Sequence, residues 1–139
     1  MGGGLYNLYA DFKDTVDFLC IYQTEAHPKE MWNLGSFLSS VSQHTTMDDR
    51  KKAALNLIKM DEEHYSIFTC DPFSDTKIRL VCDNMDNTFR LSYNAHPDRV
   101  FLIQGEKLTY IGRTIFTQVS EPMKLMTDEA RQLLKEIVG

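Results

Sequence analysis

Four short apolar runs have the length and composition of β-strands; they span residues 18–24, 78–82, 100–104 and 107–111. The first two are apolar at nearly every position, which is typical of strands buried on both faces of a sheet. The last two are separated only by Gly105 and Glu106, and such a short turn predicts a β-hairpin.

Segments with helical character alternate with these runs. Apolar residues recur at three- and four-residue spacing in residues 5–14 and 128–138, and a short helix is expected over residues 87–93. A longer helix should begin after Thr46, a good N-cap residue, and end near residue 60. Alternating strands and helices predict an α/β fold with a mixed, mainly parallel central sheet, and 139 residues suit a single domain, 1–139.

Composition narrows the functional classes. The net charge of −5 argues against a nucleic-acid binder, because neutralising phosphates requires concentrated Lys and Arg. The longest basic run, Arg50-Lys51-Lys52, is interpreted as the solvated face of a helix. No apolar stretch approaches the ~18 residues of a membrane span, and no signal peptide is recognisable.

Three cysteines, Cys20, Cys70 and Cys82, are widely spaced and form neither a disulfide framework nor a Cys-x-x-Cys motif. Such a set of unpaired cysteines indicates a reducing, intracellular compartment, and we expect the protein in the cytoplasm. The histidines and acids lack zinc-like spacing such as His-x-x-x-His, and no phosphate-binding loop is present. We therefore expect neither a metal nor a cofactor.

A polar site is predicted where the first apolar run ends. Residues 21–32 read I-Y-Q-T-E-A-H-P-K-E-M-W, so Glu25, His27 and Trp32 follow the strand closely. In open α/β sheets, ligands bind just outside the carboxyl ends of the strands. Glu25 and His27 also alternate, which directs both side chains to one side of an extended chain.

The same stretch resembles a known family, the iodothyronine deiodinases and their bacterial thioredoxin-like relatives, in which a strand ends in I/V-Y-I-x-E-A-H-x-x-D-G-W. Glu30 and Met31 depart from that pattern, where the family usually has Asp-Gly. Three further segments resemble the family in the same order. Residues 43–54 match the helix start H-Q-N-x-x-D-R-x-x-A-A, residues 81–87 match V-V-D-x-M-D-N, and residues 95–100 match A-x-P-E-R-L.

The resemblance implies a thioredoxin-like fold and roles for particular residues. His27 resembles the family histidine that handles substrate or protons, Glu25 its carboxylate partner, and His44 a second histidine of the active-site region. Pro97 precedes a strand, as the cis-proline of thioredoxins does, so we expect a cis bond there. From the residues alone, His44 is instead expected to be exposed before an N-cap, and Glu25, His27 and Trp32 to tie down the turn after the strand.

The resemblance also implies a nucleophile that these residues do not include. In the family, selenocysteine or cysteine lies in a G-S-x-T-(Sec/Cys)-P-P-F loop after a preceding strand, whereas only ten residues precede Asp11. We therefore expect a thioredoxin-like domain truncated at its N-terminus. Residues 1–4 should form a flexible start, and residues 61–77 and 113–126 enlarged loops.

The missing strand would occupy the centre of the sheet, between residues 18–24 and 100–104. Its absence would leave two apolar inner edges, and unpaired edges destabilise a sheet unless other backbone covers them. We expect a protein partner or a swapped copy to cover them. There are two alternatives. Residues 65–70 or 115–119 could rearrange the sheet, or the chain could be a fragment of a longer protein.

Two functions follow from this reasoning. The first, favoured by the sequence alone, is a pseudoenzyme: a deiodinase-like domain without its nucleophile that serves as a non-catalytic interaction or structural subunit of a larger assembly. The second is a fragment of a redox enzyme, an iodothyronine deiodinase or a thiol oxidoreductase, whose nucleophile lies upstream. The presence of Glu25, His27, Trp32 and His44 at family positions supports the second function.

Overall fold

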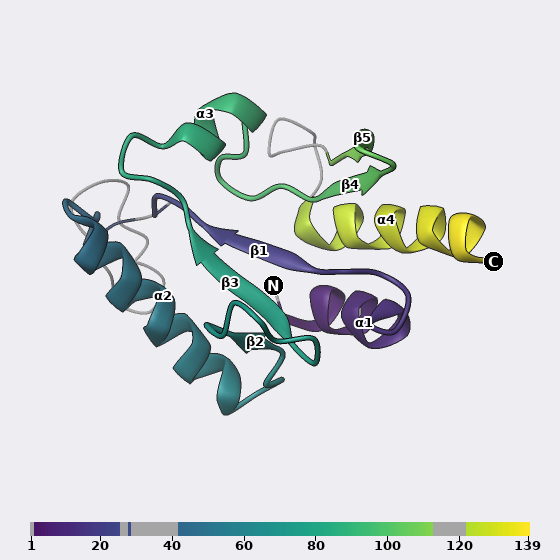
Figure 1. Ribbon diagram of the computed structural model, residues 1–139, viewed down its shortest axis with the longest axis horizontal. Helices are drawn as coiled ribbons and strands as arrows, with labels where there is room; N and C mark the ends of the chain where they lie inside the picture. Colours follow the sequence, from purple (N-terminus) through teal and green to yellow (C-terminus); the bar gives the residue numbers. More distant parts are fainter. Residues whose placement is uncertain (1, 26–27, 29–41, 113–121) are drawn as a thin grey trace. The chain divides into compact units, whose positions relative to one another are not determined.

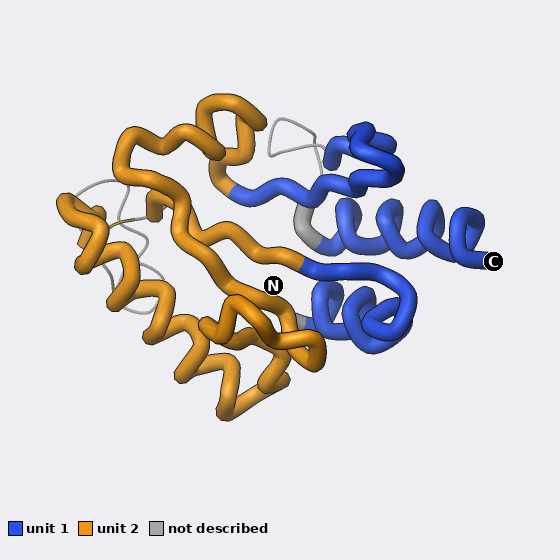
Figure 2. The backbone as a smooth tube through the Cα atoms, in the orientation of Figure 1, with its two compact units in different colours: residues 1–18, 98–139 blue, residues 19–97 orange. Residues whose placement is uncertain are grey.

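The computed structural model describes residues 2–25, 28, 42–112 and 122–139 (Figure 1). The chain divides into two compact units, coloured separately in Figure 2. One unit combines Met1–Phe18 with Asp98–Gly139, and the other comprises Leu19–Pro97. Strands and helices alternate along the chain, and the main sheet is parallel, so the predicted α/β class is confirmed.

The unit Leu19–Pro97 is built on a three-stranded parallel sheet. Strands β1 (Leu19–Tyr22), β2 (Phe68–Thr69) and β3 (Ile78–Cys82) lie in the order β1-β3-β2. Tyr22 pairs with Cys82 in the register, so β1 and β3 end together. Helix α2 (Met47–Glu62) contacts β2 and β3, and the short helix α3 (Thr88–Tyr93) follows β3 (Figure 1).

Both ends of α2 are fixed by side chains. The Thr46 hydroxyl accepts a hydrogen bond from the backbone N–H of Asp49 at 3.1 Å, which caps the helix as predicted. At the other end, the buried Asp61 carboxylate accepts from the N–H groups of Ile67 and Phe68 at 2.8 and 2.9 Å. Asp61 thus connects the end of α2 to the chain entering β2.

The other unit packs two helices and a hairpin around a small core. Helices α1 (Gly2–Phe12) and α4 (Pro122–Val138) contact each other, and β4 (Phe101–Gln104) pairs antiparallel with β5 (Lys107–Ile111). Its buried centre consists of apolar residues from the two helices: Leu8, Phe12, Ala130 and Leu134. Gly105 and Glu106 both have positive φ, at 53° and 66°, which gives the hairpin turn that the sequence predicted.

The ends of several elements differ from the sequence-based expectation. Helix α1 begins at Gly2, so residues 2–4 are helical rather than a flexible start. Helix α4 begins at Pro122, within the segment expected to be a loop over 113–126, and a proline is well suited to the first turn of a helix. Residues 113–121 lie outside the described residues.

The expected burial of the first strand is wrong. Strand β1 is shorter than residues 18–24 and has no buried residue, and its Leu19 is 55% exposed. Strand β4 is similarly open, with Ile103 66% exposed. Helix α2 packs against β2 and β3, whose Phe68 and Ile78 are buried. Among the described strands, β1 has only β3 as a neighbour and β4 has only β5. None of the described helices combines the length and apolar character needed to cross a bilayer.

Candidate active site

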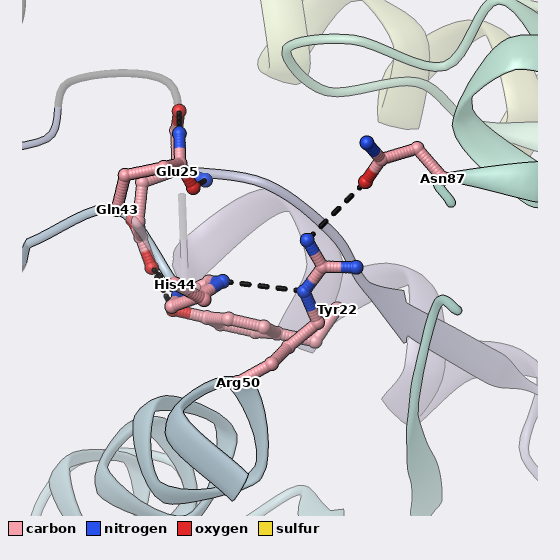
Figure 3. Close-up of polar contacts among 6 residues, drawn as sticks. All are labelled: Tyr22, Glu25, Gln43, His44, Arg50 and Asn87. Carbon is pink, nitrogen blue, oxygen red and sulfur yellow. Dashed lines mark hydrogen bonds and ion pairs between the residues drawn. The ribbon is translucent and has the colours of Figure 1, made fainter. Parts of the chain in front are cut away.

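A cluster of polar side chains lies just beyond the carboxyl end of β1 (Figure 3). Tyr22 is the last residue of β1, and Glu25 follows it. Gln43 and His44 lie three and two residues before Thr46, the cap of α2, and Arg50 projects from the first turn of that helix. The position agrees with the rule that sites in open α/β sheets form at the carboxyl ends of strands.

Glu25 is the acceptor at the centre of this cluster. The Tyr22 hydroxyl donates to its Oε1, and Nε2 of His44 lies 3.2 Å from the same oxygen. Gln43 holds the Glu25 backbone, because its side chain accepts from the Glu25 N–H at 3.2 Å and donates to the Glu25 carbonyl at 3.3 Å. The Tyr22 hydroxyl and the His44 ring therefore both contact the carboxylate, while Gln43 holds the backbone of Glu25.

Arg50 forms the other side of the cluster. Its Nε donates to Nδ1 of His44 at 3.2 Å, and one terminal nitrogen donates to the carbonyls of Asp83 and Asn84 at 3.1 and 2.8 Å. The second terminal nitrogen donates to Oδ1 of Asn87 at 3.2 Å. These bonds connect α2 to the loop between β3 and α3.

Burial determines the protonation of two neighbouring groups. Burial raises the pKa of the Tyr22 hydroxyl well above its usual value, and the adjacent Glu25 carboxylate raises it further. Tyr22 therefore remains a hydrogen-bond donor at neutral pH. Burial also raises the pKa of the Cys82 thiol, although the positive charges of Arg50 and Lys51 act in the opposite direction.

The structure brings together two of the four residues that the sequence singled out. Glu25 and His44 contact each other, whereas His27 and Trp32 lie outside the described residues. The expectation that His44 is exposed is wrong: it is 7% exposed, and both its ring nitrogens have partners inside the protein. Nor is Arg50 solvated, since it is only 1% exposed.

A sequence signal for Arg50 existed. It lies three and four residues before Ala53 and Ala54, which are buried, and residues at that spacing share one face of a helix. Lys51 and Lys52 lie off that face and are exposed, as expected for a solvated basic run.

The segment that ends at Pro97 is hydrogen-bonded to the chain just after β1. The His96–Pro97 peptide bond is cis. The Gln23 side chain donates to the carbonyls of Ala95 and Pro97 at 2.8 and 3.0 Å. The described residues hold no group of three His, Cys, Asp or Glu side chains arranged to bind a metal ion.

A parallel sheet with a carboxylate, an imidazole and a phenol at a strand end defines an α/β protein with a candidate proton-handling site. A family model for iodothyronine deiodinase matches residues 4–137. The chain is 33% identical over 108 residues to the type II iodothyronine deiodinase of Fundulus heteroclitus, a match that covers 76% of this chain and 36% of that relative. The human type II deiodinase is 32% identical over 108 residues, and that match covers 76% of this chain and 36% of the human enzyme. Thyroxine 5-deiodinase of Gallus gallus is 33% identical over 105 residues, covering 76% of this chain and 35% of that protein.

The chain therefore belongs to the iodothyronine deiodinase family, whose fold is thioredoxin-like. It spans about a third of the length of the curated relatives that it matches.

Proposed function

We propose that this chain supplies the proton-handling part of a reductive deiodination centre that acts on iodinated aromatic substrates. Replacing a carbon–iodine bond by a carbon–hydrogen bond consumes two electrons and one proton and releases iodide. A carboxylate that is oriented by a phenol and an imidazole is suited to relay that proton. The observation that carries the proposal is the convergence of Tyr22 and His44 on Oε1 of Glu25.

The two electrons must come from another group. A thiolate, not a thiol, attacks in such chemistry, and the raised pKa keeps Cys82 as a thiol at neutral pH. Cys70 is exposed in the segment between β2 and β3, and none of the hydrogen bonds described for the Glu25 cluster involves it. We infer that the nucleophile is a chalcogen outside the three cysteines of this chain, and that a thiol reductant regenerates it.

Two activity measurements test this proposal. The purified chain, supplied with a thiol reductant and an iodothyronine, should release no iodide above the level of the reductant alone. A chimera in which the part of this chain that aligns with the human type II deiodinase replaces the corresponding segment of that enzyme should release iodide. A chimera that folds, as judged by circular dichroism, yet stays inactive would contradict the proposal, and so would turnover by the chain alone that Cys70→Ser abolishes.

A second candidate function is a non-catalytic, protein-binding domain, and the open edge of β1 favours it. Strand β1 is paired on one side only among the described strands and exposes Leu19, and such an apolar edge can accept an added strand from a partner or a swapped copy. Amide hydrogen exchange of residues 19–22 should then slow as protein concentration rises, or when a partner is added. Fast exchange at every concentration, with a monomeric mass by light scattering, would exclude the swapped copy.

A further inference from the structure

We propose that Arg50 is a positioning residue that holds His44 in a single tautomer, with the ring proton on Nε2 directed at Glu25. The role of this tautomer in catalysis rests on the proposed function. The tautomer itself follows from the contacts within the unit Leu19–Pro97.

The hydrogen bonds at the two ring nitrogens lead to the same assignment. A guanidinium has only donors and stays charged, so the Arg50 Nε–H can approach Nδ1 of His44 at 3.2 Å only if that nitrogen offers a lone pair. The ring proton must then lie on Nε2, which is 3.2 Å from Oε1 of Glu25, an acceptor. The opposite tautomer would place two N–H donors against each other.

Arg50 cannot turn away from His44 without losing its other partners. Its terminal nitrogens donate to the carbonyls of Asp83 and Asn84 and to the Asn87 side chain. The buried Asp83 carboxylate fixes this loop in turn, because it accepts from the backbone N–H groups of Asn84, Phe89 and Arg90 at 2.9 to 3.0 Å. A rigid acceptor set therefore aims the guanidinium at Nδ1 (Figure 3).

Lysine could not reproduce this arrangement. Its single nitrogen cannot span the His44 ring, two carbonyls and an amide, whereas the planar fork of arginine reaches all four acceptors. The tautomer matters because only a proton on Nε2 gives Glu25 its second donor beside Tyr22. Arg50 thus orients the carboxylate through His44 without contacting it.

The molecule contains an internal reference for the measurement. Nδ1 of His64 lies 3.1 Å from the Met60 carbonyl oxygen, which can only accept, so this exposed ring should carry its proton on Nδ1. His44 and His64 are therefore expected to show opposite preferences within one sample.

Long-range nitrogen–proton NMR of the histidine rings in the full chain tests the proposal directly. At pH 8, where a free imidazole is neutral, His44 should show a protonated Nε2 and an unprotonated Nδ1, and His44→Gln identifies its signals. A proton on Nδ1, or the averaged pattern of two exchanging tautomers, would overturn the proposal. Because this NMR measurement is made on the wild-type protein, its result does not depend on whether a variant folds.

Variants separate the tautomer from general structure. Arg50→Met should give the averaged pattern at His44, whereas Lys51→Met, an exposed neighbour on α2, should leave it unchanged. If Arg50→Met fails to fold, Arg50→Lys takes its place, with partial averaging expected. A folded Arg50 variant that keeps the single-tautomer pattern would contradict the role assigned to Arg50.

In the active chimera, Arg50→Met should lower kcat by about 10²-fold with KM unchanged, as expected for loss of an acid–base contribution. An inactive chimera together with the single-tautomer pattern would reject the proposed function and leave the tautomer assignment standing. A proton on Nδ1 of His44 in an active chimera would reject the tautomer assignment and leave the proposed function standing.

Discussion

At the scale of single residues, the cluster is a hydrogen-bonded line of four groups: a guanidinium, an imidazole, a carboxylate and a phenol. Arg50 is positive, Glu25 accepts from two donors, and His44 bridges the two. Tyr22 completes the line as a donor whose pKa is raised by burial and by Glu25. Each group thereby orients the next.

Tyr22 gives the cluster a pH dependence that can be measured. Because its folded-state pKa lies above the unfolded value of about 10, its contribution to stability is complete below about pH 10 and is lost as the pH rises above that value. We expect Tyr22→Phe to lower the free energy of unfolding by about 2 kcal/mol at pH 8, as for a hydrogen bond to a charged acceptor. Urea unfolding at several pH values should show this difference shrinking above pH 10. A difference that grows with pH would be inconsistent with the assigned hydrogen bond.

The cysteines should react in an order set by their surroundings. Burial raises the pKa of Cys82, so alkylation by iodoacetamide at pH 7.5 should be slow there and fast at the exposed Cys70. Peptide mass spectrometry over time measures both rates in one sample, and Cys70→Ser serves as the control. Faster modification of Cys82 than of Cys70 would show that Arg50 and Lys51 outweigh burial.

At the scale of elements, α2 is the support of the site. Its first turn carries Arg50 and its cap follows His44, while Asp61 fastens its far end to the start of β2. The helix contacts both β2 and β3. Displacement of either end would therefore shift the imidazole and guanidinium relative to β1.

The Asp61 connection should contribute strongly to stability. Asp61→Ala would leave the buried N–H groups of Ile67 and Phe68 unpaired, each at a cost of about 1–3 kcal/mol, so we expect a loss of about 3 kcal/mol. Glu62→Ala, at the exposed neighbouring position, should change stability little. Thermal and urea unfolding provide the measurement, and equal effects of the two substitutions would reject the role assigned to Asp61.

The sequence could predict the elements that depend on local chemistry. Strand β3 and the two-residue turn of the hairpin follow from apolar runs and turn residues, and Thr46 caps α2 as its type suggests. The spacing to Ala53 and Ala54 indicates which face of α2 carries Arg50, but it does not reveal the partners of that side chain. Those partners lie in the Asp83–Asn87 loop, and His44 packs against Glu25; both are distant in sequence. The low burial of β1 depends on which elements pack against it, and an apolar run does not reveal that.

At the scale of the whole molecule, the polar cluster lies entirely within the unit Leu19–Pro97. Each hydrogen bond described for it joins two residues of that unit. The chain spans about a third of the length of its deiodinase relatives, which is consistent with a centre completed by groups outside it. We propose, accordingly, that these residues handle the proton and that another group supplies the electrons.

Single-turnover kinetics of the deiodinase chimera test this claim most directly. Glu25→Gln keeps the size of the side chain but removes the carboxylate, so iodide release should slow by about 10²-fold while the dissociation constant of the iodothyronine stays unchanged. Glu63→Gln, at an exposed position beyond α2, should leave both quantities unchanged. An unaltered rate of iodide release in the Glu25→Gln chimera, or a loss that lies wholly in substrate binding, would contradict the account.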